Sequence, residues 1–285
     1  MQSTTMPKLR FIILLILLLI ILFVWQITAD SPSNSRDWYD FYAKTPDAVT
    51  STSSVTLLNV RNWNHGTSGT LSKDWLDEIE INPTDIESIW FALSRFGNSE
   101  VSGHSFLSFE LTTGEVYSLS IEARREVGEE YSVFYGLFNQ FELWYGWGTE
   151  RDFLGTRLFG ADDQLEYYRL NLTAEEAQAI FSAVARETQS IADNPEFYNT
   201  LTANCTNLLA KTINQSYPGR IPYDLAWNLP GRSVEFLHEQ ALIDPTISVA
   251  DHKVAATIDR TDPLLLQTIQ GTSMEFSSAL RKQLE

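Results

Sequence analysis

The sequence predicts an α+β protein in which an antiparallel sheet packs on helices. Two alternating segments, 104–111 and 115–122, flank a Thr-Thr-Gly turn and therefore predict a β-hairpin. The capping-box residues Thr173 and Glu176 open a long helical segment. A second helix is predicted to begin near Cys205, because capping-type residues precede apolar residues at helical spacing there.

The N-terminus predicts one transmembrane helix. Residues 11–27 are almost wholly apolar, near the lower limit for a membrane span. Lys8 and Arg10 precede the run and predict a cytoplasmic N-terminus. Cleavage after Ala29 is possible, but an uncleaved signal anchor over residues 1–29 is favoured. The expected topology is therefore single-pass, with all that follows residue 29 in the periplasm or an equivalent exterior space.

The remaining segments complete the expected fold. Residues 30–54 are rich in Ser, Thr, Asp and Pro and predict a polar tether. Apolar residues at helical spacing predict a helix over 85–96. Strands are expected at 55–60 and 164–170, and a short helix at 233–240. The aromatic and charged segment 124–158 carries no clear periodicity and is left unassigned.

Composition excludes several kinds of function. The formal net charge of −17 argues against a nucleic-acid partner, since phosphates repel an acidic surface. It also argues against broad docking on anionic lipid, which leaves the anchor as the membrane attachment. The chain has one cysteine and no His-x-x-x-His pair, so we expect no metal site and no cofactor.

Cys205 is the strongest candidate for chemistry. A lone thiol in an exported protein has no internal disulfide partner. At the first turn of a helix, the helix dipole and unpaired N–H groups favour the thiolate, which is the nucleophilic form. Asn204 and Thr206 flank the thiol and are capping-type residues. The alternative is a buried thiol that only packs in the core.

His104 is the expected base for this thiol. It follows Gly103 at the start of an alternating strand, whereas the other three histidines have no comparable setting. A strand-end imidazole could meet the thiol and form a thiolate–imidazolium pair. Glu122 on the neighbouring strand is the first choice to orient the ring, and Glu110 is less favoured because it lies further along the His104 strand.

Five short motifs follow one another along the chain: Asn59-Val-Arg-Asn62, His104-Ser-Phe-Leu-Ser-Phe, Ser120-Ile-Glu-Ala-Arg-Arg, Glu150-Arg-Asp152 and Phe197-Tyr-Asn-Thr-Leu-Thr-Ala-Asn-Cys-Thr206. In this order they resemble the motif set of the Lnb N-terminal periplasmic domain family. The resemblance implies a circularly permuted papain-like (NlpC-type) fold, in which the histidine strand precedes the cysteine helix. It covers residues 55–215, which leaves 216–285 as a C-terminal extension packed on that domain.

The resemblance also implies roles for individual residues. Cys205 would be the nucleophile and acyl carrier, His104 the base and then the acid, and Glu122 or Glu150 the group that orients the histidine. Backbone N–H groups of Cys205 and Thr206 could hold the oxyanion. The substrate-binding candidates are Glu150, Arg151, Asp152, Arg124, Arg157, Asn204 and Thr206. For the run Glu150-Arg-Asp152, an internal ion-pair network is an equally good interpretation.

Lnb proteins are associated with N-acylation of bacterial lipoproteins. The expected function is therefore acyl transfer from a phospholipid through a cysteine thioester to an amine, plausibly a lipoprotein N-terminus. Two alternatives stay open: an amidase or lipid hydrolase of the cell envelope with the same fold, and a non-catalytic envelope module. The aromatic stretch 134–147 could contact acyl chains, although core packing is the commoner role of such residues.

Overall fold

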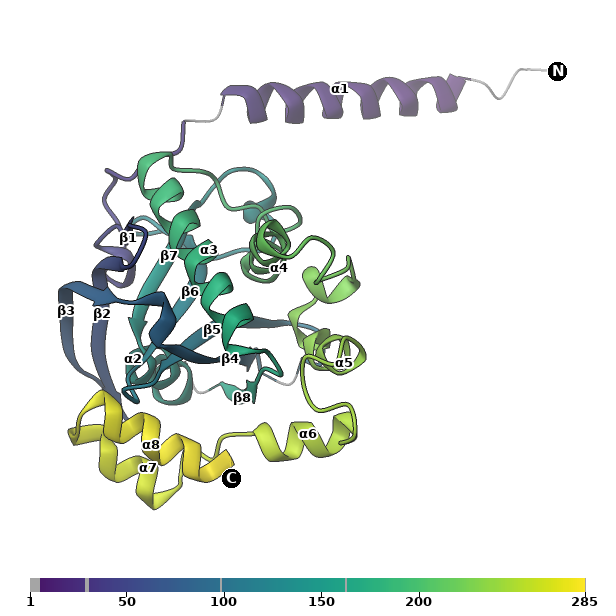
Figure 1. Cartoon of the computed structure of the whole chain (residues 1–285). Helices are drawn as coiled ribbons and strands as arrows, with labels where there is room; N and C mark the ends of the chain where they lie inside the picture. Colours follow the sequence, from purple (N-terminus) through teal and green to yellow (C-terminus); the bar gives the residue numbers. More distant parts are fainter. Residues whose placement is uncertain (1–5, 29–30, 98, 162, 285) are drawn as a thin grey trace.

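The structure is a computed structural model that describes residues 6–28, 31–97, 99–161 and 163–284. An eight-stranded sheet forms its centre, in the order β1-β2-β7-β6-β5-β4-β8, with β3 paired to β2 (Figure 1). Only β2 and β7 pair in parallel, so the sheet is mostly antiparallel. The predicted α+β class is confirmed. The strands are β1 (Asp47–Thr50), β2 (Val55–Gly66), β3 (Gly69–Ile81), β4 (Ile86–Arg95), β5 (Gly103–Leu111), β6 (Val116–Arg124), β7 (Glu142–Thr149) and β8 (Gln164–Arg169).

Helices cover both faces of this sheet. On one face α3 packs against β1, β4 and β7, while α4 packs against β5 and β6; on the other face α2 contacts β2, β6 and β7 (Figure 1). The predicted capping box of α3 is present at Thr173 and Glu176. The helices are α1 (Met6–Thr28), α2 (Glu150–Gly155), α3 (Ala174–Asp193), α4 (Cys205–Ser216), α5 (Ser233–Glu239), α6 (Val249–Ala256), α7 (Pro263–Gln267) and α8 (Ser273–Leu284).

The two faces of β5 bury different cores, because successive side chains of a strand point to opposite sides. Phe109 packs edge-on against Phe181 of α3, with ring centroids 5.4 Å apart. Phe106 packs against Phe153 of α2, with centroids 6.3 Å apart. By the same alternation His104 shares the α2 face with Phe106, while Ser105 faces α4.

The helix predicted over 85–96 is wrong, because these residues form β4. This strand pairs with β5 on one side and β8 on the other, and nearly all of it is buried. A central strand covered on both faces has apolar residues at most positions. Ile86, Ile89, Trp90 and Leu93 therefore match a helical spacing without forming a helix.

The tether expected over 30–54 packs on the domain instead, over the part that the structure describes. Trp38 and Tyr42 are buried, and their rings contact Arg124 and Trp144 respectively. β1 extends the sheet as a partner of β2. Burial of these aromatic side chains holds the segment on the domain despite its polar composition.

The N-terminal end of the chain forms α1, which extends away from the domain (Figure 1). Of the helices within the described residues, none combines the length and apolarity that a bilayer crossing needs. The predicted membrane anchor is not supported by the structure and stays a prediction.

Candidate functional site

Cys205 is the first residue of α4, and the residues around it build a strong N-terminal cap. The side-chain oxygen of Asn204 accepts hydrogen bonds from the N–H groups of Thr206 at 3.0 Å and Asn207 at 2.9 Å. Asn207 in turn accepts from the Asn204 N–H at 2.9 Å. The Cys205 N–H donates to no described residue. Of the two backbone donors predicted for an oxyanion, Thr206 is therefore already engaged and Cys205 is available.

His104 stands at the start of β5 within a hydrogen-bonded chain on β6. Its Nε2 lies 2.7 Å from Oγ of Ser120 and 3.1 Å from Oε1 of Glu122. Ser120 also donates to Glu122 at 2.8 Å. The register of β5 and β6 places Leu107 opposite Leu119, and its continuation brings His104 opposite Glu122. With Nε2 engaged in this way, Nδ1 is the ring nitrogen left for the thiol.

The electrostatics of these residues favour an ion pair between thiolate and imidazolium. Burial alone would raise the pKa of Cys205, but the His104 imidazolium and hydrogen bonds to the sulfur outweigh it and lower this pKa to about 7. Burial would likewise lower the pKa of His104, yet the Glu122 carboxylate and the Cys205 thiolate raise it to about 9. Despite burial, His104 and Arg157 hold the pKa of Glu122 far below its usual range.

Two hydroxyl groups surround the sulfur on the α4 side of the sheet. Oγ of Ser105 donates to Sγ of Cys205 at 3.9 Å and lies 2.9 Å from Oγ1 of Thr206. Oγ1 of Thr206 is itself 3.7 Å from the sulfur. Donors close to sulfur stabilise the anionic form, as the lowered pKa of Cys205 reflects.

Arg157 binds the carboxylate of Glu122 from the α2 side of the sheet, opposite to α4. It belongs to a π-helical turn, Thr156–Gly160, which follows α2 directly, and its Nη2 donates to Oε1 of Glu122 at 2.8 Å. π-helical turns are rare and occur frequently at functional sites. Arg157 also lines the pocket that opens beside Cys205, so the predicted role in substrate binding stays a prediction.

A pocket of about 460 Å³ opens beside Cys205 and His104. Arg157, Glu122, Tyr131 and Tyr198 also line it. The two tyrosine hydroxyl groups are 3.4 Å apart. Burial and the nearby thiolate raise the pKa of Tyr198, so its hydroxyl group stays neutral and can donate a hydrogen bond. The pocket thus offers a nucleophile, a proton carrier and neutral donors in one place.

Arg125 also lines this pocket, and sequence reasoning missed it. Its guanidinium lies over the rings of Tyr39 and Tyr42, at 5.5 and 5.6 Å from the centroids. No described carboxylate pairs with it within salt-bridge distance. It directly follows Arg124, the buried last residue of β6, which is the arginine of this pair that the sequence analysis singles out.

Comparison with family models identifies the family to which the chain belongs. The model described as the Lnb N-terminal periplasmic domain matches residues 72–229, which is more than half of the 285 residues. The chain belongs to the Lnb N-terminal periplasmic domain family. It is therefore a periplasmic envelope protein of the Lnb type. No curated protein and no solved structure matches it significantly. The permuted papain-like fold that the resemblance implies stays a prediction.

The match to the Lnb family contains Cys205, His104, Glu122 and Arg157 and most residues of their pocket; Tyr39, Phe41 and Tyr42 precede the matched part. Sequence reasoning found these four residues and the structure brings them together. Ser120 bridges His104 and Glu122. It begins the motif Ser120-Ile-Glu-Ala-Arg-Arg, but nothing in the sequence assigns it this bridging role.

Six of the seven predicted substrate-binding residues of this Lnb domain do not line the pocket. Asn204 caps α4, and Thr206 lies beside the sulfur. Arg124 is buried and donates to the carbonyl oxygen of Tyr42, while Arg151 donates to that of Gly271. Glu150 accepts from Arg281 of α8 at 2.8 Å. Asp152 forms a bidentate pair with Arg61, at 2.8 and 2.7 Å. These charges form internal ion pairs and hydrogen bonds, which was the alternative interpretation of the run Glu150-Arg-Asp152.

Within the described residues, no group of three or more His, Cys, Asp or Glu side chains could hold a metal ion.

Proposed function

We propose that this protein is a thiol acyltransferase of the cell envelope, with Cys205 as the acyl carrier. The observation that carries the proposal is the arrangement of Cys205, His104 and Glu122. A cysteine at a capped helix N-terminus meets an imidazole, and a carboxylate anchored by Arg157 holds that imidazole. An activated nucleophile, a base and an orienting group form the constellation used for acyl transfer.

The first step takes an acyl group from a lipid ester. The Cys205 thiolate attacks the ester carbonyl carbon, and the resulting oxyanion accepts from the Cys205 N–H and from a neutral donor such as Tyr198. As the C–O bond breaks, the His104 imidazolium gives its proton to the departing alcohol oxygen. The products are an acyl-thioester on Cys205 and a lysolipid.

The second step passes the acyl group to an amine. The amine nitrogen attacks the thioester carbonyl, neutral His104 takes its proton, and the C–S bond breaks to restore the thiolate. The acceptor we propose is the N-terminal amine of a lipoprotein. Glu122 stabilises the imidazolium at both stages, because it stays ionised at any pH at which the protein works.

Recognition of the lipid headgroup is assigned to Arg125. It lines the pocket of Cys205, it stacks on two tyrosine rings, and no described carboxylate neutralises it. A guanidinium binds phosphate oxygens through parallel hydrogen bonds. In a protein of net charge −17, such a free cation beside the nucleophile favours an anionic substrate.

An exposed apolar loop next to the pocket supports a substrate that stays in the membrane. Val133, Phe134 and Tyr135 are each more than half exposed, as is Leu201, whose loop hydrogen-bonds to this one. The ring of Phe138 in the same region contacts Trp25 of α1, with centroids 5.2 Å apart. Apolar side chains along α1 are exposed as well. We propose that α1 anchors the protein in the inner membrane and that this loop faces the lipid.

The decisive experiment traps the intermediate. Full-length protein in vesicles of phosphatidylethanolamine and phosphatidylglycerol should show Cys205 increased in mass by one acyl chain, with the label lost on hydroxylamine treatment. Deletion of the gene should remove N-acyl marks from lipoproteins. Free fatty acid released without any N-acylated product would favour a lipid hydrolase of the same mechanism. A Cys205→Ser variant that fully replaces the native protein would reject both enzymes.

A further inference from the structure

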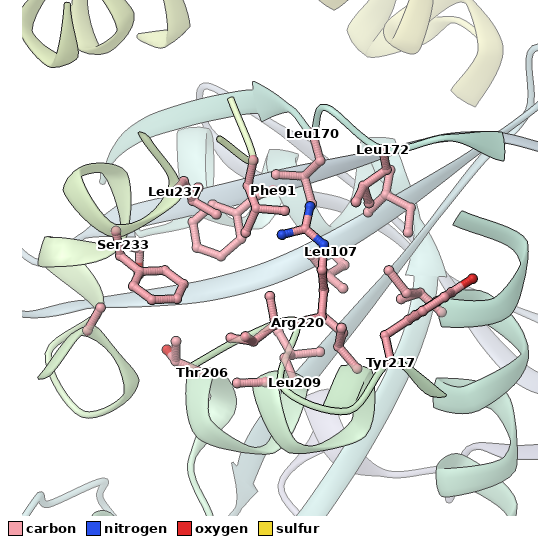
Figure 2. Close-up of a pocket in the computed structure, with 18 of the residues that line it drawn as sticks. Phe91, Leu107, Leu170, Leu172, Thr206, Leu209, Tyr217, Arg220, Ser233 and Leu237 are labelled. Atoms are coloured by element: carbon pink, nitrogen blue, oxygen red, sulfur yellow. The ribbon is translucent and has the colours of Figure 1, made fainter. Parts of the chain in front are cut away.

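A second cavity lies on the other side of the first turn of α4. Apolar side chains from the sheet, α4 and α5 line it, among them Phe91, Leu107, Leu170, Leu209 and Leu237 (Figure 2). Its volume is about 70 Å³, and the atoms exposed to it are almost all apolar. An unoccupied space of this kind in a closely packed protein marks a place where an apolar ligand gains contacts.

Residues from one end of α4 to the other line the cavity. Thr206, Leu209, Ala210, Ile213 and Tyr217 line it, at spacings that place them in one stripe of the helix. At 1.5 Å per residue this stripe is about 16 Å long. One leaflet of a bilayer has a hydrocarbon thickness of about 15 Å, half of the core. The stripe thus has the length of a single lipid chain.

Thr206 connects this cavity to the nucleophile. Its side chain lines the cavity (Figure 2), and its Oγ1 lies 3.7 Å from the sulfur of Cys205. Oγ1 of Thr206 also forms a hydrogen bond with Oγ of Ser105, at 2.9 Å, and Ser105 donates to the same sulfur. Thr206 thus contacts both the cavity and the surroundings of the nucleophile.

An ion pair also lines the cavity. Nε of Arg220 lies 3.6 Å from Oε1 of Glu176, and both residues line the cavity. In Figure 2 the guanidinium group of Arg220 lies over the apolar side chains near Leu170. Both side chains are about one quarter exposed, and an exposed pair of this kind contributes little to stability. It can therefore open at small cost.

We infer that this cavity binds one hydrocarbon chain, the acyl group that Cys205 carries. The inference rests on the proposed acyl transfer and names the part of the fold that holds the chain. The chain enters past Thr206 and runs along α4 towards Arg220. The present volume is smaller than the cavity of about 150 Å³ that binds benzene in an engineered protein. A full chain therefore needs the Arg220 side chain to swing outward, and the position of Arg220 sets the longest chain accepted.

The test uses neutral n-alcohols, whose binding cannot arise from pairing with Arg125 or Arg220. Full-length protein is titrated with 1-dodecanol and with 1-butanol, and binding is followed by thermal shift and by native mass spectrometry. We expect one molecule of dodecanol per chain and at least tenfold weaker binding of butanol. Ala210→Phe, which fills the cavity midway, should weaken dodecanol binding at least tenfold. Lys211→Phe, on the exposed side of the same helix, should leave it unchanged.

A second variant keeps the test valid if Ala210→Phe folds poorly. Leu209→Ala enlarges the cavity and should improve binding of 1-hexadecanol relative to 1-dodecanol. The inference is overturned if the wild-type protein does not bind an alcohol at a single site. It is also overturned if none of the cavity variants changes the binding. Acylation of Cys205 without chain binding in this cavity would leave the proposed function standing and reject the cavity. Chain binding in the cavity of a protein whose Cys205 never becomes acylated would leave the cavity standing and reject the proposed function.

Discussion

The carboxylate of Glu122 lies 3.1 Å from Nε2 of His104, on the strand next to it. This one contact raises the pKa of the imidazole, and the charged imidazole in turn lowers the pKa of Cys205. The protonation state of the Cys205 thiol therefore depends on Glu122 of β6, which acts on it through His104. Activation of the thiol and transfer of the acyl group both depend on this contact between Glu122 and His104.

Replacement of Glu122 by Gln should reduce acyl transfer strongly. The change keeps the shape but removes the charge that stabilises the imidazolium, so the pKa of His104 falls and that of Cys205 rises. By comparison with the carboxylate of Ser-His-Asp enzymes, we expect kcat/KM to fall on the order of 10³-fold. Steady-state transfer in vesicles measures this. Glu110→Gln, further along β5 and paired with Ser88 and Trp90, is the matched control and should stay near wild type.

Arg157 should behave as a positioning residue. Arg157→Ala releases the Glu122 carboxylate, and we expect kcat to fall by up to about 100-fold, as small displacements of catalytic groups produce. KM should hardly change, and Arg157→Lys should recover part of kcat because it keeps one donor and the charge. A rise in KM with an unchanged kcat would instead restore the substrate-binding role predicted from sequence.

Arg125 should show the opposite pattern. Arg125→Gln removes the pocket cation without touching His104 or Glu122, so KM for anionic phospholipid should rise about tenfold, the loss of roughly one charged hydrogen bond of 1.4 kcal/mol. Alkylation of Cys205 should be unaffected. Arg186→Gln, on the exposed face of α3, serves as the control. Equal KM values for anionic and neutral lipids in the wild type would reject this role.

The buried Arg61–Asp152 pair should support the fold rather than the chemistry. Asp152 accepts from Arg61 twice and from the Trp63 N–H at 2.8 Å, with both charged side chains fully buried. Asp152→Asn leaves the arginine uncompensated and should cost about 3–5 kcal/mol of unfolding free energy. Urea denaturation measures it. Asp77→Asn, at an exposed pair with Lys44, should change stability by less than about 0.5 kcal/mol.

Local patterns predicted much of this fold. The hairpin of β5 and β6, the capping box of α3 and the start of α4 all follow from short-range signals, and the structure contains each of them. The same signals failed for β4, where burial on both faces removes the alternation that marks a strand.

The candidate site was predictable in part for the same reason. A thiol at a helix start and a histidine at a strand start are local features. Which charges meet them is decided by the register of β5 and β6 and by the π-helical turn after α2. Arg124 and Arg125 are neighbours in sequence, yet Arg124, the last residue of β6, is buried, whereas Arg125, just after the strand ends, lines the pocket. Sequence alone could not choose between them.

The most direct test of the central claim is the pH dependence of iodoacetamide alkylation at Cys205 in wild-type protein, His104→Ala and His238→Ala. The thiolate forms as pH rises through the pKa of Cys205, so wild-type alkylation should increase around pH 7, well below the ordinary thiol value of about 8.5. The imidazolium is lost above about pH 9, which bounds the active range from above. His104→Ala should move the rise to higher pH, and His238→Ala should not. A thiol that does not react in folded protein, or one whose titration ignores His104, would contradict the account.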